Sequence, residues 1–331
     1  MSAATIPTAP RAAGRWVLGV AALAALLAWP LLVEDEFIQR IGALVMLSAL
    51  SASAWNLVGG YAGQISIGHV LFFGCGAYAS LLGFTWFEWA PILGAPFGIA
   101  TSLLLALIVG SPTLRLKGHY FSMATIALAE LARIVVVNTP ALGGAVGVSG
   151  PAMPRSVLDL SFISPLPYYY IFGSVLAVLL LFTWWMSRGR MGFYLRAIRG
   201  QERAARSLGV PAQRYKLFAL LVSAAFTSLT GSLYAAMLGF VDPDSGLGIL
   251  LSVKMVIAAA LGGAGTLFGP LVGSAILVPL EEMTNAAFGG GGTGITYVVY
   301  GAIIVLISRF APGGLAEIWT WLRARGTRRG G

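Results

Sequence analysis

Charged residues are scarce in this chain of 331 residues: they make up 10% of it, whereas hydrophobic residues make up 58%. A soluble domain of this size carries roughly 25% charged residues. The composition therefore indicates a membrane protein. The apolar segments are continuous and mostly long enough to span a bilayer as helices, which argues against the alternating strands of about ten residues found in membrane β-barrels.

Cysteine, lysine and histidine are also rare, and each shortage excludes a class of site. The single cysteine, Cys75, rules out a disulfide or a cysteine-based metal site within one chain. A phosphate-binding loop needs a lysine after a glycine, and no lysine here follows one: Lys117, Lys216 and Lys254. The two histidines, His69 and His119, lie on different segments without an H-E-x-x-H pattern. We expect no catalytic residue, cofactor or metal in this chain.

The apolar pattern predicts an all-α polytopic protein of about ten transmembrane helices. The last pair before the C-terminal helix is short enough to form a broken or re-entrant unit, so the count ranges from eight to ten. A signal peptide is the alternative for the first span, but that span ends in "VEDE" rather than at small residues, so we expect an uncleaved helix. The predicted spans are 16–33, 38–58, 65–85, 92–114, 119–138, 168–187, 215–239, 250–264, 266–283 and 294–309.

The charges test this topology. With ten spans, the basic N-terminal tail 1–15, the loop 188–214 and the basic C-terminal tail 310–331 share one side, and most acidic residues lie on the other. Positive charge is retained in the cytoplasm, so both termini are expected there. The net charge is +9, but the basic residues flank apolar spans and do not form a basic face on a soluble domain. This arrangement argues against nucleic-acid binding. The transmembrane domain then covers 16–309.

The stretch "RGRMGFYLRAIRGQERAARSLGVPAQRYK", which starts at Arg188, gathers eight basic residues and one acid, Glu202. A helical wheel separates an apolar side with Leu195, Ile198, Ala205 and Leu208 from a basic side. Gly200 interrupts the helix, so two short helices are predicted, and the second is expected to stop at Gly209 and Pro211. Such an amphipathic element either lies on the membrane or docks into a groove of another protein.

Two glycine-rich stretches, "GGYAGQISIGH" and "GGAGTLFGP", are similar in residue composition, and one lies in each half of the chain. Broken helices at corresponding positions of two halves mark the transport pathway in many carriers. The pattern is consistent with an internal duplication. Helix packing by small residues is the competing interpretation. The candidate pathway-lining residues are Gln64, Ser66, His69, Gly262, Gly263 and Gly265.

Four segments in this order resemble one family. They are "NLVGGYAGQISIGHVLFFGCGAYAS", "LRLKGHYFSMATIALAEL", "GRMGFYLRAIRGQERAARSLGV" and "LGGAGTLFGPLVGSAIL". Together they resemble the inner-membrane permeases of high-affinity branched-chain amino acid ABC importers, and among these the M-type subunit. The resemblance covers about residues 40 to 310 and implies the ABC importer permease fold in a bacterial inner membrane.

The resemblance also implies partners and a role for the central loop. Such a permease pairs with a second, homologous permease, two ATP-binding subunits that use ATP and Mg, and an external solute-binding protein. Its cytoplasmic loop forms a coupling helix in a groove of the ATPase, which corresponds here to 201–208. The expected coupling residues are Arg196, Arg199, Glu202, Arg203, Ala204, Ala205, Arg206 and Gly209.

Leucine, isoleucine and valine are the substrates that the resemblance implies, and urea, short amides or aromatic carboxylates are alternatives within the same family. An ion-coupled carrier is an alternative of another class. It would use Glu130, which shares a helix face with Arg133. A membrane scaffold without transport activity is a third. The outer segments 139–167 and 241–246 are expected either to contact the binding protein or to act as plain connectors.

Overall fold

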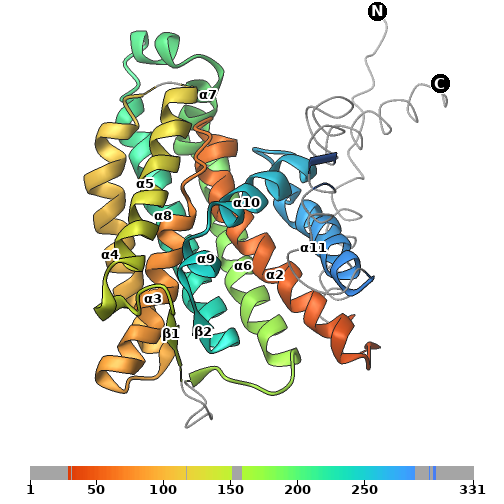
Figure 1. Cartoon of the computed structure of the whole chain (residues 1–331). Coiled ribbons are helices and arrows are strands. Elements are labelled where there is room, and N and C mark those ends of the chain that lie inside the picture. The colour runs from red at the N-terminus through yellow and green to blue at the C-terminus, as the bar shows by residue number, and fades with distance from the viewer. Residues whose placement is uncertain are drawn as a thin grey trace, which may run out of the picture.

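The structure, a computed structural model, describes residues 29–30, 32–116, 118–150, 159–287, 298 and 301–302. The expected first and last spans, both tails and Lys117 lie wholly or mainly outside these residues. The described part is a bundle of long helices (Figure 1). Its helices are α2 (Glu36–Asn56), η1 (Leu57–Tyr61), α3 (Val70–Phe87), α4 (Pro91–Thr113), α5 (His119–Val137), η2 (Pro140–Leu142), α6 (Leu166–Arg188), α7 (Arg190–Ser207), α8 (Ala212–Leu238), α9 (Pro243–Leu247), α10 (Ile249–Gly262) and α11 (Gly269–Ala287).

Seven helical stretches among the described residues are long and apolar enough to cross a membrane. In such helices every interior backbone group is bonded within its own segment, which a bilayer requires. Five of the predicted spans agree with α2, α4, α5, α6 and α8 to within a few residues. The fold is therefore all-α and multi-pass, as predicted, and the total of eight to ten spans stays a prediction.

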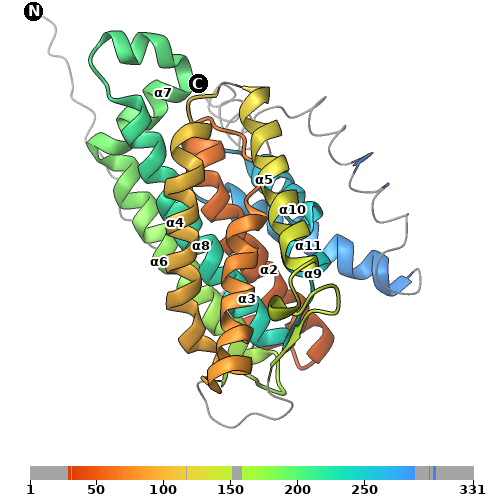
Figure 2. The same cartoon turned by 60° about the vertical axis from the view of Figure 1, so that its left-hand side comes forward.

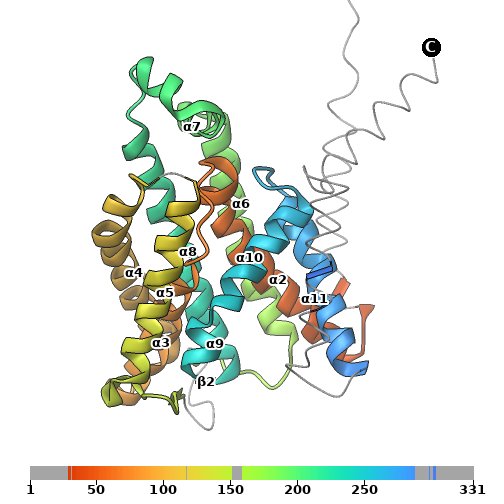
Figure 3. The same ribbon diagram turned by 45° about the horizontal axis from the view of Figure 1, so that its top comes forward.

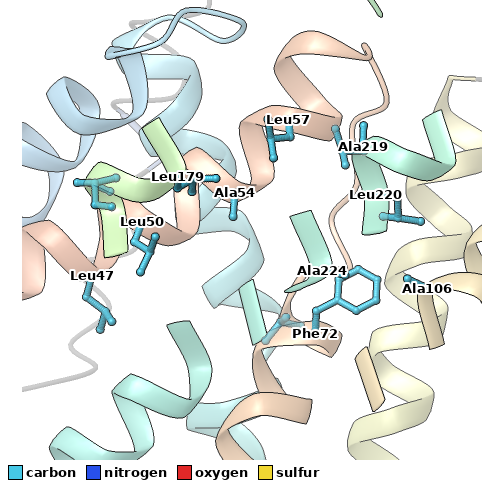
Figure 4. Packing of buried hydrophobic residues seen from close by; sticks show 14 of the residues in the cluster. Leu47, Leu50, Ala54, Leu57, Phe72, Ala106, Leu179, Ala219, Leu220 and Ala224 are labelled. Atoms are coloured by element: carbon cyan, nitrogen blue, oxygen red, sulfur yellow. The ribbon is translucent and has the colours of Figure 1, made fainter. Parts of the chain in front are cut away.

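The core lies where α2 crosses the bundle. Leu50 and Leu57 of the α2–η1 stretch have no exposed surface, and neither has Leu179 of α6. Figure 4 shows these side chains together with Phe72 of α3 and Ala224 of α8. Large and small side chains from these four helices pack together there.

Small residues bring α3, α4 and α8 close together. A methyl group added at Gly231 of α8 would lie 2.0 Å from the carbonyl oxygen of Phe73, and one at Gly76 would lie 1.8 Å from that of Ser228. Such contacts leave no room for a side chain, so the backbones themselves touch. Such packing by small residues is typical of helices within membranes.

The helix predicted over 65–85 begins later than expected. α2 continues into the π-helical turn η1, and residues 62–69 then run without regular helix until α3 begins at Val70. Gly63 has a φ of 70°, a conformation that glycine adopts without strain. The first glycine-rich stretch is thus an irregular connection inside the bundle.

A second irregular connection separates α10 from α11, which confirms the predicted break. Gly263 has a φ of 117° and Gly265 a φ of 84°. The chain turns sharply there, in backbone conformations that glycine adopts more easily than any other residue. The span expected over 266–283 begins at Gly269 instead. Figure 3 shows α10 and α11 lying against each other beside α2.

The two ends of the bundle carry different structures. α7 projects beyond the membrane-spanning helices at one end (Figures 1 and 2). At the other end, β1 (Val148–Ser149) and β2 (Phe240–Val241) form an antiparallel pair in which Val148 lies opposite Val241. This pair joins the two outer segments that the sequence analysis considered together.

Candidate functional site

The loop helix α7 is two short helices joined at a kink. Gln201 has non-helical angles, with a φ of −153° and a ψ of 96°. The kink directly follows Gly200, as the sequence predicted. Gly209 has a φ of 84°, and the N–H of Val210 donates to the carbonyl of Ala205, so the second segment ends in a glycine-containing cap.

The apolar side of α7 packs against the bundle, with one exception. Leu195, Ile198 and Ala205 are buried, whereas Leu208 is 86% exposed. The prediction that Leu208 joins this apolar side was wrong, because the kink and the helix end rotate it away from the position that one continuous helix would give. Leu208 instead lies on the outer surface of the second segment.

The outer surface of the second segment also contains Arg203 and Ala204, which are both exposed. Ala205, which was expected to share the docking role with Ala204, packs inward beside Ile198 and Ala212. The exposed residues Arg203, Ala204, Ser207 and Leu208 are called the docking face below. It combines a positive charge, two small residues and one large apolar side chain.

Arg199 connects α7 to both glycine-rich connections. Its Nη1 donates to the carbonyl oxygen of Gly60 at 2.6 Å and lies 3.4 Å from that of Ala264. A methyl group added at Gly63 would lie 3.0 Å from the Arg199 side chain. The guanidinium thus reaches from the first segment of α7 to two connections that are far apart in the sequence.

Asn56 joins the same two connections from within the bundle. Its Oδ1 accepts from the N–H of Gly265 at 2.7 Å, and its Nδ2 donates to the carbonyl of Thr266 at 2.9 Å. A methyl group added at Gly60 would lie 1.8 Å from Asn56 Oδ1 and 2.4 Å from the Gly265 nitrogen. The connections therefore touch through backbone, and this junction is defined by Asn56, Gly60, Gly265 and Arg199.

Glu202 anchors the second segment of α7 to α8. Its Oε2 lies 2.6 Å from Lys216 Nζ and its Oε1 lies 2.7 Å from an Arg206 nitrogen. The Lys216 side chain is only 1% exposed. A buried ammonium is tolerated only when it is paired, so this ion pair fixes the second segment on the start of α8.

Three other coupling and pathway candidates, Arg196, His69 and Ser66, form hydrogen bonds at separate positions in the bundle. Arg196 donates to the carbonyl of Ser187 at 3.1 Å. His69 is fully buried, with Nε2 2.8 Å from Ser223 Oγ. Because that hydroxyl donates to the carbonyl of Ala54, the imidazole must supply the proton. Ser66 is also buried, and its carbonyl accepts from Trp55 Nε1 at 2.6 Å.

The remaining glycine candidates lie at the second connection. A methyl group at Gly262 would lie 1.7 Å from the carbonyl oxygen of Gly269, so Gly262 lets the end of α10 meet the start of α11. Gly263 is buried and Gln64 is partly exposed near the first connection. The structure brings Gly265 and the first connection together at the junction, while His69 and Ser66 lie deeper as ties between helices.

Helix α5 stands apart from α4 over much of its length. A cavity of about 670 Å³ opens between α3, α4 and α5, and its lining is almost entirely apolar. Near the start of α5, Ser122 Oγ donates to the carbonyl of Ile65 at 2.6 Å. Near its end, Arg133 Nη1 lies 3.1 Å from Asp244 Oδ1 of α9. Polar contacts near its two ends therefore hold α5 to the bundle.

Three residues of this arrangement were not proposed from the sequence. Asn56 is a single amide at the end of a long apolar run, directly before "LVGG". An isolated polar side chain at such a place could have been recognised as a candidate for a structural hydrogen bond. Gly60 could be noticed only as one glycine among many. Lys216 lies 14 residues after Glu202, and only the fold, which turns the chain back between α7 and α8, places the two together.

The chain was compared with known proteins. The family model described as "Branched-chain amino acid transport system / permease component" matches residues 37–308. The chain is 31% identical over 278 residues to the high-affinity branched-chain amino acid transport system permease protein LivM of Escherichia coli, covering 75% of the chain and 64% of LivM. The chain thus spans about two thirds of the length of this relative.

Two further similarities are more distant. The autoinducer 2 import system permease protein LsrC of Klebsiella pneumoniae is 32% identical over 130 residues, which is 38% of the chain and 36% of LsrC. Among solved structures, PsaBC from Streptococcus pneumoniae in complex with Fab matches with a TM-score of 0.48 and 17% identity, over 85% of this chain and 94% of that one.

Proposed function

The chain belongs to the family of permease components of branched-chain amino acid transport systems, and we propose that it is the membrane subunit of an ATP-driven importer of leucine, isoleucine and valine. The family match over 37–308 and the similarity to LivM support this proposal. The permease performs no covalent chemistry. It moves substrate by alternating access across the inner membrane.

The proposed assembly contains two ATP-binding subunits, a second homologous permease and an external solute-binding protein. ATP and Mg are used by the ATP-binding subunits. Among the described residues, Arg115, Arg188, Arg190, Arg199 and Arg203 lie at the α7 end, and Asp242 and Asp244 lie at the opposite end. This distribution supports the proposal of a cytoplasmic α7. With that orientation, we propose that the paired strands β1 and β2 lie on the outer side, where the binding protein docks.

The coupling step is proposed to run through α7. ATP binding closes the ATPase subunits, the docking face moves with them, and the kink at Gln201 divides that movement between two anchors. Glu202 with Lys216 passes it to α8. Arg199 passes it to the junction of the two glycine-rich connections. The contact of Arg199 with Gly60 is the observation that carries this mechanism, because it ties the loop to the breaks in the helices.

The relatives of this chain are named for different substrates: LsrC, which matches 38% of this chain, is named for autoinducer 2 import. Urea, short amides and aromatic carboxylates are the competing substrates of the same mechanism. The test is uptake by the purified transporter in liposomes with ATP inside. Leucine uptake that depends on ATP and on the binding protein supports the proposal, whereas uptake of urea or an amide alone contradicts the substrate assignment.

The alternative hypothesis, an ion-coupled carrier, makes a different prediction. It requires Glu130 to gain and lose a proton during transport, but that carboxylate lies 2.6 Å from Arg133. A Glu130→Gln variant that abolishes uptake driven by a pH gradient, in the absence of ATP, would support the carrier. Uptake that needs ATP in both the wild type and the variant removes it.

A further inference from the structure

Arg133 lies between two carboxylates at the end of the bundle opposite α7. On α5, Glu130 Oε1 lies 2.6 Å from Arg133 Nη2, and on α9, Asp244 Oδ1 lies 3.1 Å from Arg133 Nη1. The Glu130 carboxylate also accepts from Arg133 Nε at 3.1 Å. These three residues, here called the ion triad, combine two negative groups with one positive group.

Glu130 and Arg133 lie within the apolar helix α5 and Asp244 lies on α9, and all three side chains are accessible. Arg133 and Glu130 precede the end of α5 at Val137 by four and seven residues, which is about 6 Å and 10 Å along the helix axis. The side chains of Arg133, Glu130 and Asp244 are 31%, 41% and 84% exposed. Ionisable residues within membrane-spanning helices almost always face a water-filled cavity or other polar groups, and we expect the same of this side of α5.

The chemistry of the ion triad matches a zwitterion. An amino acid must shed water from its ammonium and its carboxylate when it enters an apolar passage, and that desolvation is costly unless charged partners replace the water. Glu130 and Asp244 offer acceptors for an ammonium, and the Arg133 guanidinium offers donors for a carboxylate. Exposed apolar side chains of Leu131 and Ile134 on the same helix suit an aliphatic side chain.

We propose that Glu130, Arg133 and Asp244 form a site in the transport pathway that binds the charged groups of a zwitterionic amino acid. This inference rests on the proposed function and narrows its substrate class. Urea and short amides carry no charge, so they can form hydrogen bonds with the ion triad but no ion pair. An aromatic carboxylate brings only a negative group to a site that already holds two, so it is disfavoured there.

The experiment uses the complete transporter in liposomes, with its binding protein, ATP and radiolabelled leucine. Arg133→Gln and the double variant Glu130→Gln/Asp244→Asn are expected to lower the leucine turnover rate by roughly tenfold or more, the effect of losing a charged hydrogen bond. ATP hydrolysis stimulated by the binding protein should persist, so the ATP used per leucine rises. Glu88→Gln, which removes a carboxylate elsewhere at the same end, should leave both rates unchanged.

A reversed triad separates substrate binding from a structural ion pair. Glu130→Arg/Arg133→Glu/Asp244→Lys keeps attraction among the three groups but inverts every charge. The proposal predicts that leucine uptake stays low in this variant. Uptake restored to the wild-type rate, or unaffected by the neutral variants, overturns the proposal. Wild-type transporter that fails to move leucine at all contradicts the proposed function itself, before any variant is compared.

Discussion

Arg199 Nη1 lies 2.6 Å from the carbonyl oxygen of Gly60, and this contact ties the loop helix α7 to the irregular connection that follows α2. The same guanidinium reaches the second connection at Ala264. A single side chain therefore touches both glycine-rich connections. In the proposed transporter, this contact is one route from the ATPase to the pathway.

Removing the Arg199 side chain should uncouple the transporter. A charged hydrogen bond of this kind contributes about 1.5–3 kcal/mol, so Arg199→Ala is expected to lower ATP-driven uptake by roughly tenfold or more. Membrane insertion and subunit assembly should be retained. Uptake is measured in liposomes, with Arg190→Ala as control, since Arg190 is an exposed arginine of the same helix. Equal uptake by both variants would show that the Arg199 contact is dispensable.

Gly60 should tolerate no side chain. A methyl group there would meet the Gly265 nitrogen at 2.4 Å, so Gly60→Ala must push the two connections apart. The expected loss of stability is about 3 kcal/mol, at the upper end of overpacking effects. Thermal unfolding in detergent measures it. Gly173→Ala is the matched control, because a methyl group added there meets nothing within 4 Å. Equal melting temperatures for the two variants would contradict the packing described here.

The Glu202–Lys216 pair should show a non-additive response. Glu202→Gln leaves the Lys216 ammonium, which is 1% exposed, without its charged partner, and breaking such a pair costs about 3–5 kcal/mol. Glu202→Gln/Lys216→Met removes the buried charge as well and should recover much of that loss. A double-mutant cycle on thermal stability tests this. Additive effects would mean that the two residues do not interact.

Adjacent alanines of α7 should respond differently to the same change. Ala204 is exposed on the docking face and Ala205 is buried. Ala204→Trp, alone or with Arg203→Glu, should leave the permease folded but prevent the ATP-binding subunits from associating. Ala205→Trp should instead destabilise α7. Pull-down of the ATP-binding subunits and melting temperature distinguish the two outcomes, and an Ala204→Trp variant that still binds ATPase would argue against this docking face.

Much of this fold follows from local sequence. The limits of α4, α5 and α6 follow from long, predominantly apolar runs, and the kink of α7 follows from Gly200 within a basic amphipathic stretch. The break between α10 and α11 was visible as a cluster of glycines. In each case the signal lies within about 20 residues of the feature that it predicts.

The remainder depends on contacts between distant segments. Residues 65–69 of this connection were predicted to begin a helix over 65–85, but the irregular path of the connection is held by bonds such as that from Trp55 Nε1 to the carbonyl of Ser66. Leu208 was misplaced because one continuous helix was assumed on the wheel. The meeting of Gly60 with Gly265, and of Glu202 with Lys216, depends on how the helices return to one end of the bundle. No local pattern encodes that.

The central claim is that the docking face of α7 binds an ATPase. The most direct test is gentle detergent extraction of the tagged chain from its own host, followed by mass spectrometry of the proteins that stay bound, for the wild type and for Ala204→Trp. The account predicts that ATP-binding subunits and a second permease accompany the wild type, and that Ala204→Trp keeps the permease but loses the ATP-binding subunits. A wild-type chain that purifies alone in several mild detergents would contradict it.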